Sequence, residues 1–403
     1  NSMENPLTSP LRSGYYTTTT ASLSGGEEAV TYYVSGRFED RAGVVPNNEL
    51  ERYSLRANVD IQPQDNLDIT VNTSYLDSDV RLPESARSFR GFGAQAGANF
   101  PLFSFGVMPD GSRGECLATL VQGAPESVCE EIQGNMQVTF DDLFTIDRRQ
   151  RVNRFTGSVS GQWRPWGWFT NELTLGLDFI QSEDKNLFPL DPERPFGSTS
   201  EGFIRDQRHT DVLRTLEYSG SITSQLTDDV RSVTTLGAQY FNSRGEMVGC
   251  IGEGFASATA TACDASFEER GFSNEAEKTE VGAYLQQRFG LNEYLYLTAG
   301  LRVDDNSAFG VNQGQIWSPS ANASWAISDM PFWEVDLIDR LRLRFAWGKA
   351  AQAPPLYAAV ERWTPVGLSE GGGREIGISP AFPGNPQLTA ERKEEIELGV
   401  DAE

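Results

Sequence analysis

The sequence is short of three features, and each shortage excludes a class of protein. Its 403 residues contain a single histidine, which argues against a histidine-based metal site and against a Ser-His-Asp catalytic site. The 33 Lys and Arg are outnumbered by 57 Asp and Glu, so the formal net charge is −24. Such an acidic chain is a poor candidate for nucleic-acid binding, which needs cations to displace counterions. No apolar run approaches the roughly 18 residues of a membrane-spanning helix, which excludes a helical membrane protein.

What the sequence does contain is a recurrent alternation of apolar and polar residues. Within 294–304, one face carries the apolar residues Leu295, Leu297, Ala299, Leu301 and Val303. Alternation with period two is typical of a β-strand with one apolar face. The pattern predicts about thirteen strands, many of them as long as a tilted membrane strand. Their expected ranges are 15–24, 29–39, 50–61, 67–77, 149–164, 168–183, 210–226, 230–244, 277–289, 294–305, 316–327, 339–349 and 391–402.

The connections between these strands alternate between short and long. The short ones contain Gly, Asn, Asp or Pro and lie at 25–28, 63–66, 165–167, 227–229 and 291–293. The long ones lie at 40–49, 78–148, 184–209, 245–276, 306–315 and 350–390, and only 328–338 departs from the alternation. A transmembrane antiparallel up-and-down β-barrel has short periplasmic turns at one end and long extracellular loops at the other. The alternative, a soluble β-sandwich or propeller, has no reason to keep its tight turns together.

Three stretches carry motifs more specific than the strand pattern, and the third has two parts, 341–360 and 384–401. In residues 22–60 an SGG…YY hairpin precedes a V-PNN…RY segment. Residues 301–325 end on SPSANASW, and residues 341–360 read LRLRFAWGKAAQAPPLYAAV. Residues 384–401 then follow a GNP-x-L-x-x-E pattern into a strand that ends on ELGVD. In order and spacing, these motifs resemble TonB-dependent outer-membrane receptors of the SusC/RagA type.

The resemblance implies an all-β plugged barrel of about 22 strands. We therefore expect residues 1–403 to be part of one β-barrel domain and an internal segment of a longer protein. A plug domain, a TonB box and the closing C-terminal strands of such a receptor are not recognisable in the sequence.

The same resemblance implies active transport across the bacterial outer membrane of large nutrients such as oligosaccharides or peptides. The TonB complex would supply energy through the plug, and a SusD-like surface lipoprotein would close the extracellular mouth. The lipid bilayer and lipopolysaccharide are the other expected neighbours, and no nucleic acid is expected. The alternatives are a passive porin or structural outer-membrane barrel, and a surface adhesion or assembly protein built on the same barrel. An enzyme is not expected, because nothing in the sequence reads as catalytic.

Aromatic rings in the long connections are candidates for contact with ligand or partner, because such rings stack on sugars and on other flat or apolar ligands, although packing within the loops is the favoured interpretation. The candidates are Phe89, Phe92, Phe100, Phe103, Phe105, Tyr357, Trp363 and Phe382. Arg342 and Arg344 alternate with apolar residues and are expected to point into the lumen, where they would face a plug.

No cofactor or metal is expected. Paired acidic residues offer oxygen ligands for Ca²⁺, but no calcium-binding motif surrounds them, and solvated loop charge is the simpler interpretation. These candidates are Glu130-Glu131, Asp141-Asp142, Glu268-Glu269 and Asp304-Asp305-Asn306.

The four cysteines predict two disulfides. Cys116 and Cys129 share one long connection, Cys250 and Cys263 share another, and the two pairs have the same spacing. Four cysteines allow three connectivities, of which pairing within each loop is the simplest. A metal site is the alternative, although no C-x-x-C spacing is present. Each disulfide should stabilise the fold by roughly 3 kcal/mol. Peptide mapping without reduction should recover Cys116–Cys129 and Cys250–Cys263, whereas a cross-loop pair or free thiols would contradict this pairing.

Overall fold

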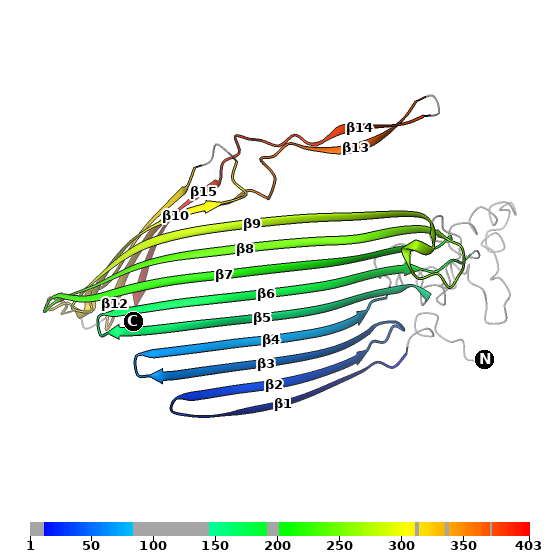
Figure 1. The fold of residues 1–403 in the computed structure, drawn as a ribbon. Helices are drawn as coiled ribbons and strands as arrows, with labels where there is room; N and C mark the ends of the chain where they lie inside the picture. Colours follow the sequence, from blue (N-terminus) through cyan, green and yellow to red (C-terminus); the bar gives the residue numbers. More distant parts are fainter. Residues whose placement is uncertain (1–11, 84–144, 192–200, 311–313, 335–337, 371–372) are drawn as a thin grey trace, which may run out of the picture.

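The computed structural model describes residues 12–83, 145–191, 201–310, 314–334, 338–370 and 373–403. Within these ranges a 13-stranded antiparallel sheet contains β1 to β12 in sequence order, followed by β15 (Figure 1). Consecutive strands pair with each other, so the sheet runs up and down as the sequence predicts, and its two edges, β1 and β15, are not joined. No helix in the described part of the chain is long and apolar enough to cross a membrane.

The strands are long, and those in the middle of the sheet are the longest. Their bounds are β1 Tyr15–Glu27, β2 Val30–Ala42, β3 Glu49–Gln64, β4 Leu67–Arg81, β5 Asp147–Trp166, β6 Phe169–Phe188, β7 Phe203–Thr227, β8 Val230–Phe255, β9 Ser266–Leu291, β10 Leu295–Asn306, β11 Ile316–Ala326, β12 Leu341–Gln352 and β15 Glu391–Ala402. β13 (Arg362–Glu370) and β14 (Gly373–Phe382) form a separate hairpin, and Cys263–Ala265 and Ile327–Asp329 form single 3₁₀ turns.

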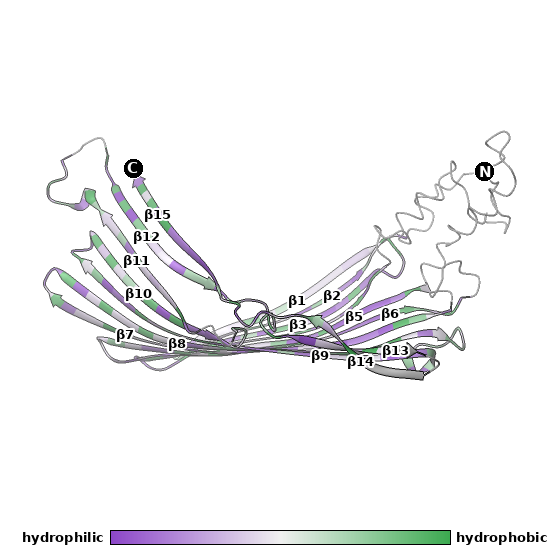
Figure 2. Ribbon diagram, turned by 90° about the horizontal axis from the view of Figure 1, so that it is seen from above, coloured by the Kyte–Doolittle hydropathy of each residue, from purple (hydrophilic) through white to green (hydrophobic). Residues whose placement is uncertain are grey.

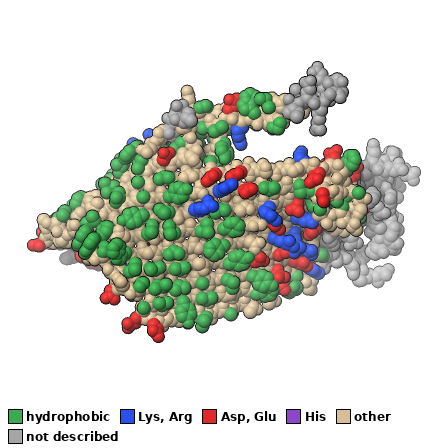
Figure 3. Space-filling view, viewed as in Figure 1, with side chains coloured by type: hydrophobic (Ala, Val, Ile, Leu, Met, Phe, Trp, Pro, Cys, Tyr) green, Lys and Arg blue, Asp and Glu red, His purple; other side chains and the backbone are tan. Residues whose placement is uncertain are grey.

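The two faces of the sheet differ sharply in polarity. Cross-strand pairing puts the apolar members of the alternation on one face, where large side chains such as Leu55, Leu175 and Leu285 are 59%, 47% and 50% exposed. The sheet bends into an open trough (Figure 2). Figure 3 views the convex face: hydrophobic side chains cover its middle, acidic ones mark the short turns, and charges of both signs gather at the opposite end. So much exposed apolar surface is stable in lipid rather than in water.

The apolar band crosses the strands obliquely. On β2 the limit of the band on the side of the long connections is Asp40. Cross-strand pairs followed from Asp40, strand by strand, form a row that leads to Val248 on β8. On β10 the limit is Asp305, whose row reaches β8 at Tyr240. The two limits therefore differ by eight residues (248 − 240) over eight strands. A slide of one residue per strand corresponds to a strand tilt of about 35°, which matches membrane barrels.

Several strands extend beyond the band at the loop end, where the sequence predicts loops. Most of the expected 245–276 loop is strand, because β8 continues to Phe255 and β9 starts at Ser266. Ion pairs join neighbouring strands in these extensions, such as Arg244 with Glu275 at 2.7 Å. Charged residues face both sides there, so the alternation that reveals a strand in lipid is lost while the backbone pairing continues. The β13–β14 hairpin also lies inside an expected loop, 350–390, and was not predicted.

A small core lies at the tip of these extensions. Leu187, Ile204, Phe255 and Cys263 are buried together, and Ile204 is 0% exposed. Gly202 has a positive φ of 88°, and a Cβ at this position would lie 2.3 Å from the Phe255 ring. Glycine is thus required where the chain enters β7 beneath the ring. The tip has its own packed centre above the membrane band.

The two faces predict opposite responses to the same substitution on adjacent residues. Leu175→Arg, in the middle of the apolar band on β6, should destabilise the full-length protein in lipid by about 2–4 kcal/mol. Thr174→Arg is the matched control, because Thr174 lies on the concave face and should change stability by less than about 0.5 kcal/mol. Denaturant titration in lipid vesicles measures both, and similar losses for the two variants would contradict the assignment of the faces.

Candidate functional site

The concave face is the candidate functional surface, because hydroxyl, amide and charged side chains line it where the convex face is apolar. Arg302 on β10 donates through Nε to both carboxylate oxygens of Asp304, at 2.8 and 2.9 Å, and through Nη1 to Gln239 at 2.6 Å. Gly282 makes room for this pair, since a Cβ there would lie 2.4 Å from Arg302 Nη2. Arg302 and Asp304 neutralise each other within this network, so the pair forms part of the wall without adding net charge to it.

Four arginines on β2 and β3 form the most basic part of this face, and we call Arg37, Arg41, Arg52 and Arg56 the arginine patch. Arg37 and Arg41 flank Glu39 on β2, and Arg52 lies directly opposite Glu39 on β3. Glu39 is only 2% exposed. Its carboxylate pairs with Arg37 at 3.2 Å and also with Arg41. One buried acid is therefore shared between two guanidinium groups.

The remaining polar contacts of the patch are with neutral groups. Arg41 lies over the Tyr16 ring, 4.4 Å from its centroid, and Arg37 donates to the Tyr16 hydroxyl at 3.2 Å. Arg52 donates to Ser78 at 3.5 Å, and Arg56 donates to Asn58 at 3.3 Å. The sequence analysis did not predict this patch. Its signal was the even spacing of Arg37 and Arg41 on one strand, and of Arg52 and Arg56 on the next, which places each pair on one face.

The predicted lumen arginines lie on this same concave face, at the end with short turns. Arg344 donates to Asp401 of β15 at 2.8 Å, and Arg342 is the residue directly opposite Asp401. Their position fits the expected direction, and contact with a plug stays a prediction.

The aromatic candidates divide into two groups. Phe89, Phe92, Phe100, Phe103 and Phe105 lie outside the described residues. Tyr357, Trp363 and Phe382 are 39%, 51% and 40% exposed. Trp363 and Phe382 belong to the β13–β14 hairpin, where Arg362 lies 5.3 Å from the centre of the Phe382 ring. These three rings are accessible but are separate from the arginine patch in the fold, and ligand contact by any of them stays a prediction.

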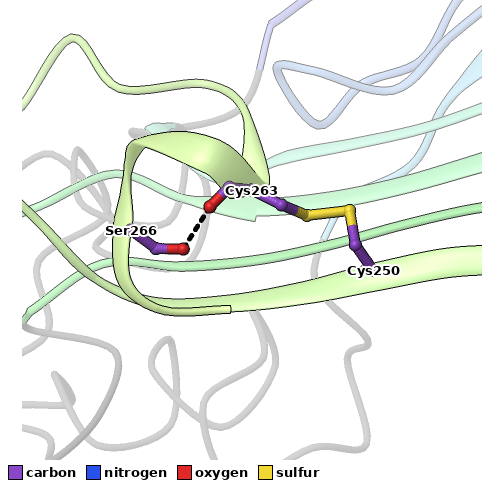
Figure 4. Close-up of a disulfide and its surroundings, with 3 residues drawn as sticks. All are labelled: Cys250, Cys263 and Ser266. Atoms are coloured by element: carbon purple, nitrogen blue, oxygen red, sulfur yellow. Dashed lines mark hydrogen bonds between the residues drawn. A yellow bond between two sulfur atoms is a disulfide. The ribbon is translucent and has the colours of Figure 1, made fainter. Parts of the chain in front are cut away.

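The Cys250–Cys263 disulfide is present in the structure and ties the end of β8 to the 3₁₀ turn before β9 (Figure 4). Cys263 is 5% exposed within the small core, and the Ser266 hydroxyl donates to its carbonyl oxygen. Cys116 and Cys129 lie outside the described residues. The bond braces the tip of an extended hairpin where lipid no longer supports the strands.

Among the described residues, no group of three or more His, Cys, Asp or Glu side chains is arranged to hold a metal ion. Of the calcium candidates, Asp304 accepts hydrogen bonds from Arg302, and Asn306 donates to Glu280 at 2.6 Å. Glu268 and Glu269 are adjacent on β9 and so lie on opposite faces. Glu130, Glu131, Asp141 and Asp142 lie outside the described residues.

Comparison with known proteins places this sheet in a family. Residues 134–402 match the family described as "TonB dependent receptor-like, beta-barrel". TonB-dependent receptor P26 of Formosa agariphila is 24% identical over 402 residues, which cover 94% of this chain and 37% of that protein. The ferric enterobactin receptor PirA of Pseudomonas aeruginosa is 26% identical over 214 residues, which cover 52% of this chain and 26% of that protein.

Solved structures show the same fold. The RagAB peptide importer in its "closed-closed" state superposes with a TM-score of 0.78 at 18% identity, over 98% of this chain and 43% of that chain. The siderophore receptor PirA from Acinetobacter baumannii gives 0.53 at 13% identity, over 97% and 48%. This chain thus spans less than half the length of each of these relatives. It belongs to the TonB-dependent receptor-like β-barrel family, whose members are receptors and transporters of the outer membrane.

Proposed function

We propose that the chain is part of the barrel wall of a SusC/RagA-like transporter that imports oligosaccharides or peptides across the outer membrane. The observation behind the proposal is a tilted wall with an apolar convex face and a polar concave face, built on a fold that matches the RagAB importer over 98% of the chain. The TM-score of 0.78 with RagAB, against 0.53 with a siderophore receptor, favours this branch of the family.

In this proposal the short turns lie in the periplasm and the long connections face outward. Cargo binds at the mouth and passes along the concave face, whose hydroxyl, amide and guanidinium groups exchange hydrogen bonds with a polar solute. No covalent step is needed. The wall supplies binding, while a plug moved by the TonB complex supplies gating. A SusD-like lipoprotein closes the mouth, as suggested by the RagAB structures titled "open-open" and "closed-closed".

The proposal predicts that uptake depends on energy. Cells producing the full-length receptor should accumulate labelled oligosaccharide or peptide, and accumulation should fall to the level of a receptor deletion when the proton gradient is collapsed or TonB is removed. A small solute that enters through general porins is the control and should be unaffected. Uptake that persists without TonB would instead identify a passive porin, and the absence of any receptor-dependent uptake would also contradict the proposal.

A further inference from the structure

We propose that the arginine patch binds the anionic groups of an acidic oligosaccharide, one that carries carboxylate or sulfate, as it enters the barrel. The inference rests on the proposed function and adds the class of cargo and the residues that select it. It follows from where the charges of β2, β3 and β4 lie, how far they neutralise one another, and what surrounds them.

Charges on these strands are sorted by face. Near the loop end the convex face carries five acids of the three strands together with Arg81, whereas the concave face carries all four arginines of the patch and one acid, Glu39. The acids are Asp40, Glu49, Glu51, Asp77 and Asp79. In a chain of net charge −24, acids would be expected on both faces. The concave wall is instead positive, which in a narrow aqueous passage concentrates anions.

The positive charge of the patch is not neutralised from within. Its acid, Glu39, is held by Arg37 and Arg41, and in the described part of the chain Arg52 and Arg56 form no ion pair. Two guanidinium groups thus share one carboxylate, and the other two have none.

Three other loop-side cations of the concave face differ from the patch, because each of the three has its own acid. Arg154 donates to Asp178 at 3.0 Å, Arg302 pairs with Asp304, and Lys278 pairs with Glu280. These balanced pairs leave β2 and β3 with the surplus positive charge near the edge of the apolar band. Arg205, which donates to Gln207 at 3.0 Å, lies farther out on the β7 extension.

The chemistry of the patch fits carboxylate or sulfate. A guanidinium group presents paired N–H donors that match two oxygens of such an anion, and it keeps its charge at every physiological pH. Arg37, Arg41 and Arg56 are exposed and Arg52 is half-buried, so all four can reach a solute.

The surroundings favour a sugar over a peptide. Hydroxyl side chains occupy the neighbouring concave positions, namely Thr18, Thr20, Ser35, Ser54 and Ser74. Such a surface can hydrogen-bond sugar hydroxyls but offers no apolar pocket for peptide side chains. The Tyr16 ring beside Arg41 adds an aromatic face of the kind on which sugars stack.

The patch also lies where entering cargo would meet it. Phe38 and Tyr53, directly opposite each other on the convex face with ring centroids 4.8 Å apart, mark the upper part of the apolar band on β2 and β3. Arg37 and Arg52 are their chain neighbours on the concave face. The patch therefore lies at the loop-side mouth of the passage.

The test uses the full-length receptor with the double variant Arg52→Gln/Arg56→Gln. The matched control, Arg154→Gln/Asp178→Asn, removes a balanced pair from the same face and leaves its net charge unchanged. Binding is measured by calorimetry for a panel of carboxylated and sulfated oligosaccharides, for neutral oligosaccharides of the same length, and for an acidic peptide. Heat-modifiable mobility on gels shows that each variant forms a barrel.

We expect the unaltered receptor to bind at least one acidic oligosaccharide more tightly than its neutral counterpart, with an affinity that falls as salt rises. The double variant should bind it about tenfold or more weakly, as expected for the loss of two charge-assisted contacts, and the control should bind as the unaltered receptor does. Binding of no acidic sugar, equal affinity in both variants, or a preference for the acidic peptide would overturn the inference. Uptake measured in parallel separates the two proposals: binding without energised import contradicts only the transporter function, whereas import that ignores the arginines contradicts only the cargo assignment.

Discussion

One constraint shapes most of this structure: the two faces of a single sheet meet two different solvents, while the backbone must pair fully because lipid offers it no hydrogen bonds. Antiparallel pairing satisfies the backbone on both sides of the eleven inner strands of the described sheet, and alternation then sends every second side chain to each solvent. The strands are also tilted, as the strands of membrane barrels are. A membrane of fixed thickness cuts the inclined strands at a level that slides by one residue from each strand to the next, as the rows from Asp40 and Asp305 show.

Where lipid imposes this rule, the sequence was enough to predict the structure. The expected and observed ranges of β10 and β15 agree closely, because apolar residues occupy every second position along most of β10 and from Ile396 onward in β15. Beyond the apolar band, on the side of the long connections, the alternation of apolar and polar residues ends. β8 and β9 continue to Phe255 and Ser266 with charged residues on both faces, and only the partner strand reveals that they are strands. The β13–β14 hairpin, which is separate from the main sheet, was not predicted either, whereas the Cys250–Cys263 pair was predictable because a short loop brings its cysteines together.

The arginine patch shows a second limit of sequence reasoning. The alternation shows that Arg37 and Arg41 share one face of β2, and that Arg52 and Arg56 share one face of β3. Whether the two pairs lie side by side depends on the register set by the turn between β2 and β3. The net charge of −24 gives no sign of the patch, because it sums the charges of both faces. In the fold, many acids form ion pairs or lie on the convex face, and one part of the concave face is therefore positive. The selectivity of such a passage depends on which face a charge occupies more than on the sum of charges.

The central claim is that the convex face meets lipid and the concave face meets water. A nitroxide scan along β10, residues 295–306, in the full-length protein in bilayers tests it most directly. Collision with oxygen, which concentrates in lipid, should peak at Leu297, Ala299 and Leu301, and collision with a water-soluble nickel complex should peak at Thr298, Gly300 and Arg302. Two profiles of period two in opposite phase are the predicted result. Profiles that rise and fall together, or that lack the period, would contradict the account.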